Sequence, residues 1–454
     1  MSLWSLERVG RSLQGRVAGD ASVVPGSLSL DTRTLRPGAC FVALKGARDG
    51  HAFAKDALSA GAAALLVDHE LDLPIPQLIV RDTLEALQAW GRLRLEEVRP
   101  RQVFAVTGSV GKTTTKELLA AATGGWKTPG NRNNTLGLPE ALATIPEGLE
   151  SAVLEMGMSF PGEIETLCRI APPDWGLLTC VGTAHVENFP DGQEGIARAK
   201  GELVAGLRSG GTWVHLESDP WAAWIAAEPW AAEARAVRVG ERQPFGWSEV
   251  RSLGPRGSRF LLRTDAGEVE VALRLPGLHN VRNAALAGSL AALAGHPLGA
   301  IAAGLGSVEP EAGRGRLHAL GAGGWLLDES YNASPDSMLA CAAALLDLPG
   351  GEPVAVLGAM RELGAEAGRL HRDTGAGLRA AGLARLWAFG DHAADLAGGF
   401  GPDGAAFPDF ETLRDDPAGL AALPRGARIL VKGSRFWRSE RAVDWILNRH
   451  PPQD

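Results

Sequence analysis

The sequence VFAVTGSVGKTTT, residues 103–115, decides the fold of this 454-residue chain. Its apolar beginning predicts a buried β-strand, its glycines predict a tight loop, and a helix is predicted to follow. Such a loop at a helix N-terminus suits a triphosphate, because backbone N–H groups and the positive end of the helix dipole face the phosphates. The stretch therefore predicts an ATP site made of Thr107, Gly108, Ser109, Val110, Gly111, Lys112, Thr113 and Thr114.

Two side chains of this loop have defined chemistry. Lys112 can reach the β- and γ-phosphates, and the Thr113 hydroxyl can ligate Mg²⁺. The strict pattern G-x-x-x-x-G-K-[ST] requires glycine at position 106, where this chain has Val106, so the loop is a shorter variant. A glycine-rich turn that contains a lysine by chance is the alternative interpretation.

Further candidates follow along the chain. Glu155 ends the apolar run 152–154, and a nucleotide-bound Mg²⁺ commonly takes an acid from a neighbouring strand. His185 comes just after the apolar run 177–181, at the strand end where α/β proteins gather their sites. Lys200 is predicted on the next helix. Taken alone, His185 and Lys200 are also consistent with ordinary core or surface residues.

The rest of the chain repeats the alternation of strand and helix. Segments with helical spacing include 83–97 and 113–122. This alternation predicts an α/β protein with parallel sheets. Short apolar runs bounded by Gly or Pro predict further strands at 40–44, 62–67, 77–80, 176–181, 212–216, 325–328, 354–357, 386–389 and 428–431.

Two segments depart from this rhythm. Residues 247–275 read as alternating short strands, at 259–263 and 269–275, which predicts an antiparallel extension. Residues 284–308 are uncharged, but His296-Pro297 interrupts them, so two packed helices are predicted rather than a membrane span. We expect three domains at about 1–81, 82–310 and 311–454.

Composition excludes several classes of protein. The net charge of −8 argues against a broad nucleic-acid surface, and the N-terminus lacks the pattern of a secretory signal. The four cysteines form no CxxC pair, so neither a disulfide framework nor a zinc site is expected, and the cytoplasm is the expected compartment. Only seven of the 45 basic residues are lysines.

Taken in order, these segments resemble the Mur ligase superfamily, the ATP-dependent amide-forming enzymes of peptidoglycan precursor synthesis. The resemblance covers nearly the whole chain. It rests on the phosphate loop, on His185 and on residues 131–134 (NRNN), 155–157 (EMG), 199–202 (AKGE), 275–284 (LPGLHNVRNA) and 315–317 (GRL).

The flanking segments indicate which member of the family is meant. Residues 31–51 resemble the UDP-sugar-binding domain of its two later ligases, and residues 328–338 (DESYNASPDSM) resemble the signature of the ligase that adds D-alanyl-D-alanine. Residues 358–364 and 431–435 match the same C-terminal domain. Ser334 and Ala359 depart from it, since Asn and Asp are usual there, and Ala359 puts any carboxylate contact in doubt.

The resemblance implies a UDP-sugar domain, a central ATPase domain and a Rossmann-like C-terminal domain that binds the dipeptide. ATP would phosphorylate the terminal carboxylate of UDP-N-acetylmuramoyl-tripeptide, and the amine of D-alanyl-D-alanine would then displace phosphate. The implied catalytic residues are Lys112, His185, Lys200 and Arg316. The implied cofactors are ATP, two Mg²⁺ and a CO₂-derived carbamate on Lys200.

The remaining implied roles concern ligands. The metal ligands would be Thr113, Glu155, His185 and the Lys200 carbamate, and further ATP contacts would come from Asn280, Arg316 and Asp328. A monomer without nucleic-acid partner or membrane insertion is expected. The implied substrate-binding residues are Asp31, Thr32, Arg33, Lys45, Asp49, His51, Asn133, Asn134, Tyr331, Asn332, Ser334 and Lys432.

Three alternatives differ in class. Another ligase of the superfamily, adding an amino acid or extending folate with glutamate, is the nearest, although a folate enzyme should lack residues 31–51. A P-loop NTPase that drives partner binding would hydrolyse nucleotide without needing a peptide amine. An inactive relative is disfavoured, because Lys112, Thr113, Glu155, His185 and Lys200 are all present.

Overall fold

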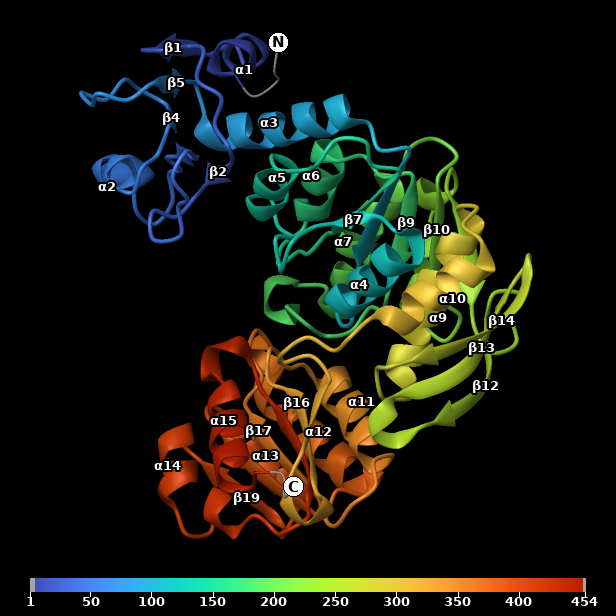
Figure 1. The fold of residues 1–454 in the computed structure, drawn as a ribbon. Helices are drawn as coiled ribbons and strands as arrows, with labels where there is room; N and C mark the ends of the chain where they lie inside the picture. Colours follow the sequence, from blue (N-terminus) through green and yellow to red (C-terminus); the bar gives the residue numbers. More distant parts are fainter. Residues whose placement is uncertain (1–4, 452–454) are drawn as a thin grey trace.

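The computed structural model describes residues 5–451, which form four sheets arranged along the chain (Figure 1). The N-terminal sheet lies at one end of the molecule and the C-terminal sheet at the other, with the central sheet between them. The predicted α/β class with parallel sheets is confirmed. The domain boundaries at 81/82 and 310/311 stay a prediction.

The N-terminal sheet has the strand order β1-β5-β4-β3-β2 and is parallel except for β1. Alternate side chains of its strands point to opposite faces, so Val42 and Leu66 pack toward α1 and α3 while Phe41 and Leu65 pack toward α2. Its elements are α1 (Leu6–Ser12), β1 (Arg16–Ala18), β2 (Leu28–Ser29), β3 (Cys40–Val42), α2 (Ala54–Ser59), β4 (Ala64–Val67) and β5 (Gln77–Ile79).

The central sheet is wholly parallel, with the order β11-β10-β9-β6-β8-β7. Helices α4, α9 and α10 cover one face, and α5, α6, α7 and α8 cover the other. Its strands are β6 (Gln102–Thr107), β7 (Trp126–Lys127), β8 (Ser151–Glu155), β9 (Trp175–Leu178), β10 (Thr212–Leu216) and β11 (Arg235–Val239). Its helices are α4 (Lys112–Thr123), α5 (Gly137–Leu142), α6 (Glu163–Ile170), α7 (Gly192–Ala205), α8 (Pro220–Ala227), α9 (Leu278–Leu293) and α10 (Leu298–Ser307).

The antiparallel extension is confirmed as a three-stranded sheet of β12 (Gly246–Ser252), β13 (Ser258–Thr264) and β14 (Gly267–Leu273). The sequence did not single out β12, because a register shift between Ser248 and Arg251 breaks its alternation. The predicted pair of helices is also confirmed, as α9 and α10. Among the described residues, no helix is both long and apolar enough to cross a bilayer.

The C-terminal sheet has the order β15-β16-β20-β17-β18-β19 and is parallel except for β15. Helices α11, α12 and α13 pack on one face, and α14 and α15 on the other. Its strands are β15 (Arg316–Ala319), β16 (Trp325–Glu329), β17 (Pro353–Gly358), β18 (Arg385–Phe389), β19 (Gly404–Phe407) and β20 (Arg428–Lys432). Its helices are α11 (Pro335–Leu346), α12 (Ala367–Ala381), α13 (Ala393–Phe400), α14 (Phe410–Asp415) and α15 (Glu440–Arg449).

Helix α3 (Thr83–Val98) belongs to two cores. Leu87 and Trp90 of its first half pack in the N-terminal core, and Leu95 of its last turn packs in the central core. No comparable helix joins the central and C-terminal domains, since residues 308–315 between α10 and β15 contain only turns and isolated bridges.

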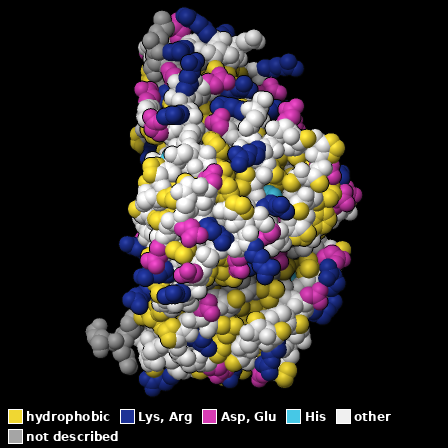
Figure 2. Space-filling view, turned by 90° about the vertical axis from the view of Figure 1, so that its right-hand side faces the viewer, with side chains coloured by type: hydrophobic (Ala, Val, Ile, Leu, Met, Phe, Trp, Pro, Cys, Tyr) yellow, Lys and Arg dark blue, Asp and Glu magenta, His cyan; other side chains and the backbone are white. Residues whose placement is uncertain are grey.

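On the face of the molecule shown in Figure 2, acidic and basic side chains are interspersed and do not form separate acidic and basic patches.

Candidate functional site

The predicted phosphate loop joins the end of β6 to the start of α4. Gly108 and Gly111 have φ angles of 143° and 85°, a region that L-residues with side chains rarely adopt. A Cβ on Gly108 would also lie 1.9 Å from Thr179 Oγ1, on the strand end beside it. Both positions therefore require glycine. Val106, in contrast, is a buried residue of β6.

Lys112 and Thr113 lie at the N-terminus of α4, as predicted. The Lys112 ammonium donates to the carbonyls of Gly108 and Ser109, at 2.7 and 3.3 Å, so it lies over its own loop. Burial lowers the pKa of Lys112, and the Glu155 carboxylate opposes this shift. The helix N-terminus and this ammonium together make the loop a site for an anion.

Glu155 is brought next to this helix because β8 pairs in parallel with β6. It is buried, and its Oε1 accepts from the Thr113 hydroxyl at 3.2 Å and from the Asn133 amide at 2.8 Å. The Thr128 hydroxyl accepts the Glu155 backbone N–H at 3.1 Å. Three predicted residues, Thr113, Glu155 and Asn133, therefore meet at one point.

Lys116 is a member of this cluster that the sequence prediction missed. Its side chain is completely buried, and its ammonium lies 3.4 Å from Glu155 Oε2 and donates to the Gly130 carbonyl at 2.7 Å. The signal was its spacing, because a residue three positions after Thr113 shares the same helix face. Lys116 thus fixes the position of Glu155 and of the loop around Gly130.

Lys200, on α7, is buried in a different way. It is 2% exposed, and within residues 5–451 no carboxylate forms an ion pair with it. Burial lowers the pKa of Lys200 to about 7, and repulsion from Lys112 adds to the shift while Cys180 opposes it. The electrostatic interaction places Lys200 near the phosphate loop, and at neutral pH a substantial fraction of its amine is uncharged.

His185 connects the central and C-terminal domains. Its Nδ1 lies 2.6 Å from Glu362 Oε2, and the adjacent His185 ring lowers the pKa of Glu362 despite its partial burial. Both residues have positive φ, 66° and 63°, a costly backbone conformation that often marks functional sites. In the same loop, a Cβ on Gly182 would lie 2.4 Å from Asp336 Oδ2. The loop after β9 therefore contacts the C-terminal domain at two points.

Several predicted nucleotide and peptide contacts lie where the chain enters the C-terminal domain. Arg316, Asp328 and Tyr331 line one pocket together with Arg435. The Arg314 guanidinium lies 3.9 Å from the centre of the Tyr331 ring. Asp328 accepts from the backbone N–H groups of residues 313 and 330, at 2.9 and 3.1 Å, so its carboxylate already orders the turn.

The other predicted contacts mostly bond to neighbouring groups. Asn280 donates to the Pro276 carbonyl at 2.8 Å, and Asn134 accepts the Gly137 N–H at 2.8 Å. Asn332 is exposed. Lys432 is buried and donates to Glu329 at 3.3 Å.

Both departures from the family signature are buried. Ser334 precedes α11, where its backbone N–H donates to the Ser337 hydroxyl at 2.9 Å, so the turn keeps a hydrogen bond. Ala359 is fully buried and brings no charge to the C-terminal domain.

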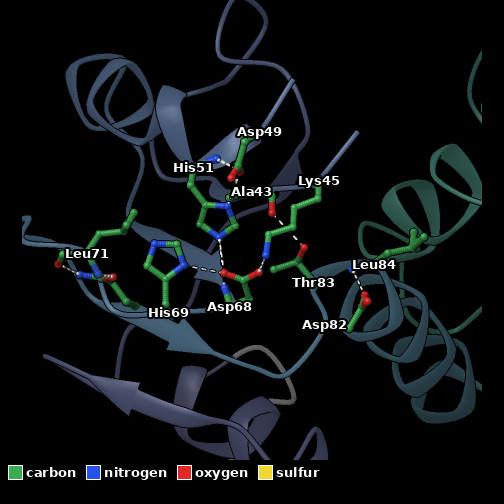
Figure 3. Close-up of polar contacts among 11 residues, drawn as sticks. Ala43, Lys45, Asp49, His51, Asp68, His69, Leu71, Asp82, Thr83 and Leu84 are labelled. Atoms are coloured by element: carbon green, nitrogen blue, oxygen red, sulfur yellow. Dashed lines mark hydrogen bonds and ion pairs between the residues drawn. The ribbon is translucent and has the colours of Figure 1, made fainter. Parts of the chain in front are cut away.

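The predicted nucleotide-sugar residues lie in the N-terminal domain, and Figure 3 shows three of them, Lys45, Asp49 and His51. The Asp31 carboxylate accepts from Arg33, and Thr32 lies between them in the turn. Lys45 pairs with Asp68 at 2.5 Å, and His51 Nδ1 lies 2.6 Å from Asp49. The structure brings Lys45, Asp49 and His51 together through Asp68, which the sequence prediction did not include.

Three family descriptions match the chain. "Mur ligase family, catalytic domain" matches residues 26–109, "Mur ligase middle domain" matches 106–291, and "Mur ligase, glutamate ligase domain" matches 313–435. The UDP-N-acetylmuramoyl-tripeptide–D-alanyl-D-alanine ligase of Escherichia coli K12 is 37% identical over 450 residues, which is 97% of either chain. The chain belongs to the Mur ligase family.

Solved structures agree with this membership. A crystal structure of MurF from Acinetobacter baumannii matches this Mur ligase with a TM-score of 0.89 and 31% identity, covering 98% of this chain and 99% of the other. The MurF ligase of Thermotoga maritima, solved with ADP, matches with a TM-score of 0.80 and 29% identity, covering 93% and 97%. The likeness therefore extends over all three sheets of the ligase as well as the antiparallel extension.

Proposed function

We propose that this Mur ligase uses ATP to join D-alanyl-D-alanine to UDP-N-acetylmuramoyl-tripeptide, giving the pentapeptide precursor of peptidoglycan. The observation that carries the proposal is the full-length likeness to ligases named for this reaction, including the C-terminal domain. The geometry agrees, because the loop after β9, beside the phosphate loop, contacts the C-terminal domain at residues 336 and 362. Both halves of an amide-forming site belong to one chain, so we assign the activity to a monomer.

The first step brings two anions together, the tripeptide carboxylate and the γ-phosphate of ATP. Lys112 and the N-terminus of α4 offset this repulsion, and the left-handed glycines allow the backbone N–H groups to approach the phosphates. The carboxylate oxygen attacks the γ-phosphorus, and ADP leaves. The amine of the dipeptide then attacks the acyl carbon, loses a proton, and phosphate leaves.

The cluster around Glu155 fits a nucleotide-bound Mg²⁺. The Thr113 hydroxyl and the Glu155 carboxylate, 3.2 Å apart, are hard oxygen donors of the kind that Mg²⁺ takes, and they lie at the phosphate loop. When bound there, Mg²⁺ supplies positive charge to the phosphate oxygens. Lys116 and Asn133 hold the carboxylate in place for this role.

We infer that Lys200 reacts with CO₂ to form a carbamate that, with His185, holds a second Mg²⁺. The support is chemical, since only an uncharged amine adds CO₂, and Lys200 has a pKa of about 7. Addition converts a buried amine into an oxygen donor that suits Mg²⁺. Arg316, Asp328 and Asn280 are assigned to ATP, and the residues around Tyr331 to the dipeptide.

We place the nucleotide-sugar contacts in the N-terminal domain, on residues 31–51, with Asn133 and Asn134 nearer the metal. The domains are assigned as 1–81, 82–310 and 311–454. We assign the reaction to the cytoplasm, consistent with four free cysteines. Ultracentrifugation of the purified chain tests the monomer.

The reaction is tested by phosphate release from ATP in the presence of UDP-N-acetylmuramoyl-tripeptide. We expect release to depend on D-alanyl-D-alanine and not on single amino acids. Lys112→Met is the matched control for contaminating ATPases. Turnover with single amino acids and none with the dipeptide would assign this chain to the amino-acid-adding branch and refute the proposal.

A further inference from the structure

A buried histidine holds the loop that follows β17 in the C-terminal domain. His371, on α12, is completely buried, and its Nε2 accepts the Met360 backbone N–H at 3.0 Å. Its Nδ1 lies 2.7 Å from the carbonyl oxygen of Ala367, the first residue of the same helix. One ring therefore joins the beginning of the loop at residues 359–366 to the helix that ends it.

Both ring nitrogens of His371 have a defined role. A nitrogen that accepts an N–H carries no proton, so the single proton of the ring is on Nδ1, which donates to the Ala367 carbonyl. Burial lowers the pKa of His371, which agrees with a neutral ring. An apolar side chain at this position would leave the buried Met360 N–H without its partner.

The loop held by His371 meets the central domain. Its Glu362 lies 2.6 Å from His185, in the loop after β9. Val186, the next residue of that loop, packs against the C-terminal core cluster that contains Met360. The residue whose N–H is bonded to His371 thus belongs to the cluster that receives Val186, and Glu362 follows it by two positions.

The backbone of this loop is strained at the point of contact. Glu362 has a φ angle of 63°, which is costly for a residue with a side chain. Gly364 has a φ angle of 54°, and a Cβ there would lie 2.9 Å from the Cβ of Glu187, so the two loops approach closely. A strained backbone persists only where its surroundings fix it. The hydrogen bond from Met360 to His371 is one such support.

We propose that His371 is a positioning residue for the ligase reaction, acting through the Met360 N–H and Glu362 on the loop that carries His185. The proposal rests on the proposed function, because the contact with His185 affects the rate only if the central and C-terminal domains share one reaction. A histidine with a structural role alone would stabilise α12 and leave the loop after β9 unaffected.

Two substitutions separate the roles of the two ring nitrogens. His371→Asn keeps an amide N–H near the position of Nδ1 and removes the acceptor of the Met360 N–H, whereas His371→Gln places an amide oxygen near the position of Nε2. We expect His371→Asn to speed hydrogen–deuterium exchange in residues 359–366 and 182–188, and to lower kcat about 10–100-fold. His371→Gln should restore most of both properties.

A double variant tests whether His371 acts through Glu362. If it does, His371→Asn/Glu362→Gln loses no more rate than the more affected single variant. Thr374→Val is the matched control, because Thr374 is buried on the same helix and its hydroxyl donates to the Leu370 carbonyl at 2.6 Å. This variant should leave kcat and the exchange of both loops unchanged.

Hydrogen–deuterium exchange needs no substrate, so it separates this proposal from the proposed function. Absence of dipeptide-dependent phosphate release from the unaltered protein refutes the proposed function, whatever the exchange. Unchanged exchange of residues 182–188 in His371→Asn overturns the role of His371. So does an unchanged kcat in that variant, an equal loss of rate in Thr374→Val, or additive losses in the double variant.

Discussion

Lys116 and Lys200 lie in two buried regions of the central domain, and the charged groups around them differ. Lys116 has the Glu155 carboxylate 3.4 Å away and a carbonyl at 2.7 Å, whereas Lys200 has no carboxylate partner in the described chain. Burial disfavours the charged form of a lysine. It lowers the pKa of Lys200 to about 7, and repulsion from Lys112 adds to the shift.

The difference teaches that two equally buried lysines can serve opposite purposes. Lys116 pairs with a buried carboxylate and holds it in position, whereas Lys200 has a lowered pKa and no carboxylate partner among the described residues. In a chain with only seven lysines, neither position is satisfied by arginine, which is larger and stays protonated.

The largest expected effect follows from removing the side-chain cation of Lys116. Lys116→Met leaves the Glu155 carboxylate buried without its partner, and we expect the free energy of unfolding to fall by about 3–5 kcal/mol. Urea unfolding measures it. The double variant Lys116→Met/Glu155→Gln should recover part of the loss, because it removes the orphaned charge. A fall below about 1 kcal/mol would mean that the pair is not formed.

The next largest effect concerns Lys200. Lys200→Arg stays protonated and cannot form a carbamate, so we expect kcat to fall by about 10²–10³-fold. Steady-state phosphate release measures it. Lys200→Ala with added formate or acetate is the companion experiment, since a small carboxylate can occupy the emptied space and restore part of the rate. Full activity of Lys200→Arg would refute the carbamate.

A smaller change tests how firmly Glu155 is held. Thr128→Val keeps the shape of the side chain and removes the hydroxyl that accepts the Glu155 N–H, which costs about 1–3 kcal/mol when a buried N–H loses its partner. We expect this loss in urea unfolding, with a higher Mg²⁺ concentration needed for half-maximal activity. Unchanged stability and unchanged Mg²⁺ dependence would show that Lys116 and Asn133 are enough to hold Glu155 in position.

The smallest effect is the pH dependence of stability. The folded pKa of Lys200 is lowered from 10.5 to about 7, so the folded state releases this proton first as the pH rises. The free-energy cost of burying the charged Lys200 ammonium acts in full below pH 7. It declines between pH 7 and pH 10.5 and is absent above pH 10.5. Relative to Lys200→Met, the protein should gain about 1 kcal/mol from pH 7 to 8 in CO₂-free buffer. Parallel pH profiles of the two proteins would contradict the low pKa.

Local pattern was enough to predict the phosphate loop and the strands that fill the sheets. The loop is defined by adjacent glycines, and the inner strands by apolar runs, so neighbours in the sequence carry the information. Short edge strands such as β15 were missed, because none of the residues Arg316–Ala319 is fully buried and the segment has no such run.

The contacts of the site that the sequence did not predict join residues far apart in the chain. Lys116 meets Glu155 only because β6 and β8 are neighbours in the sheet, and His185 meets Glu362 only because two domains touch. Asp68, which joins Lys45 and His51, lies outside the 31–51 segment altogether. Periodicity and spacing predict one helix or strand at a time. Each of these contacts is made between two different elements, so local patterns do not reveal it.

Helix α3 has a consequence for the size of substrate. It is 16 residues long, about 24 Å, and both of its halves are embedded in cores, so it cannot bend without breaking one of them. If the N-terminal domain holds the nucleotide end of the substrate, the rigid α3 fixes the distance from that domain to the phosphate loop. The peptide end of the substrate must span this distance. A peptide one residue too short would bind and still fall short of ATP.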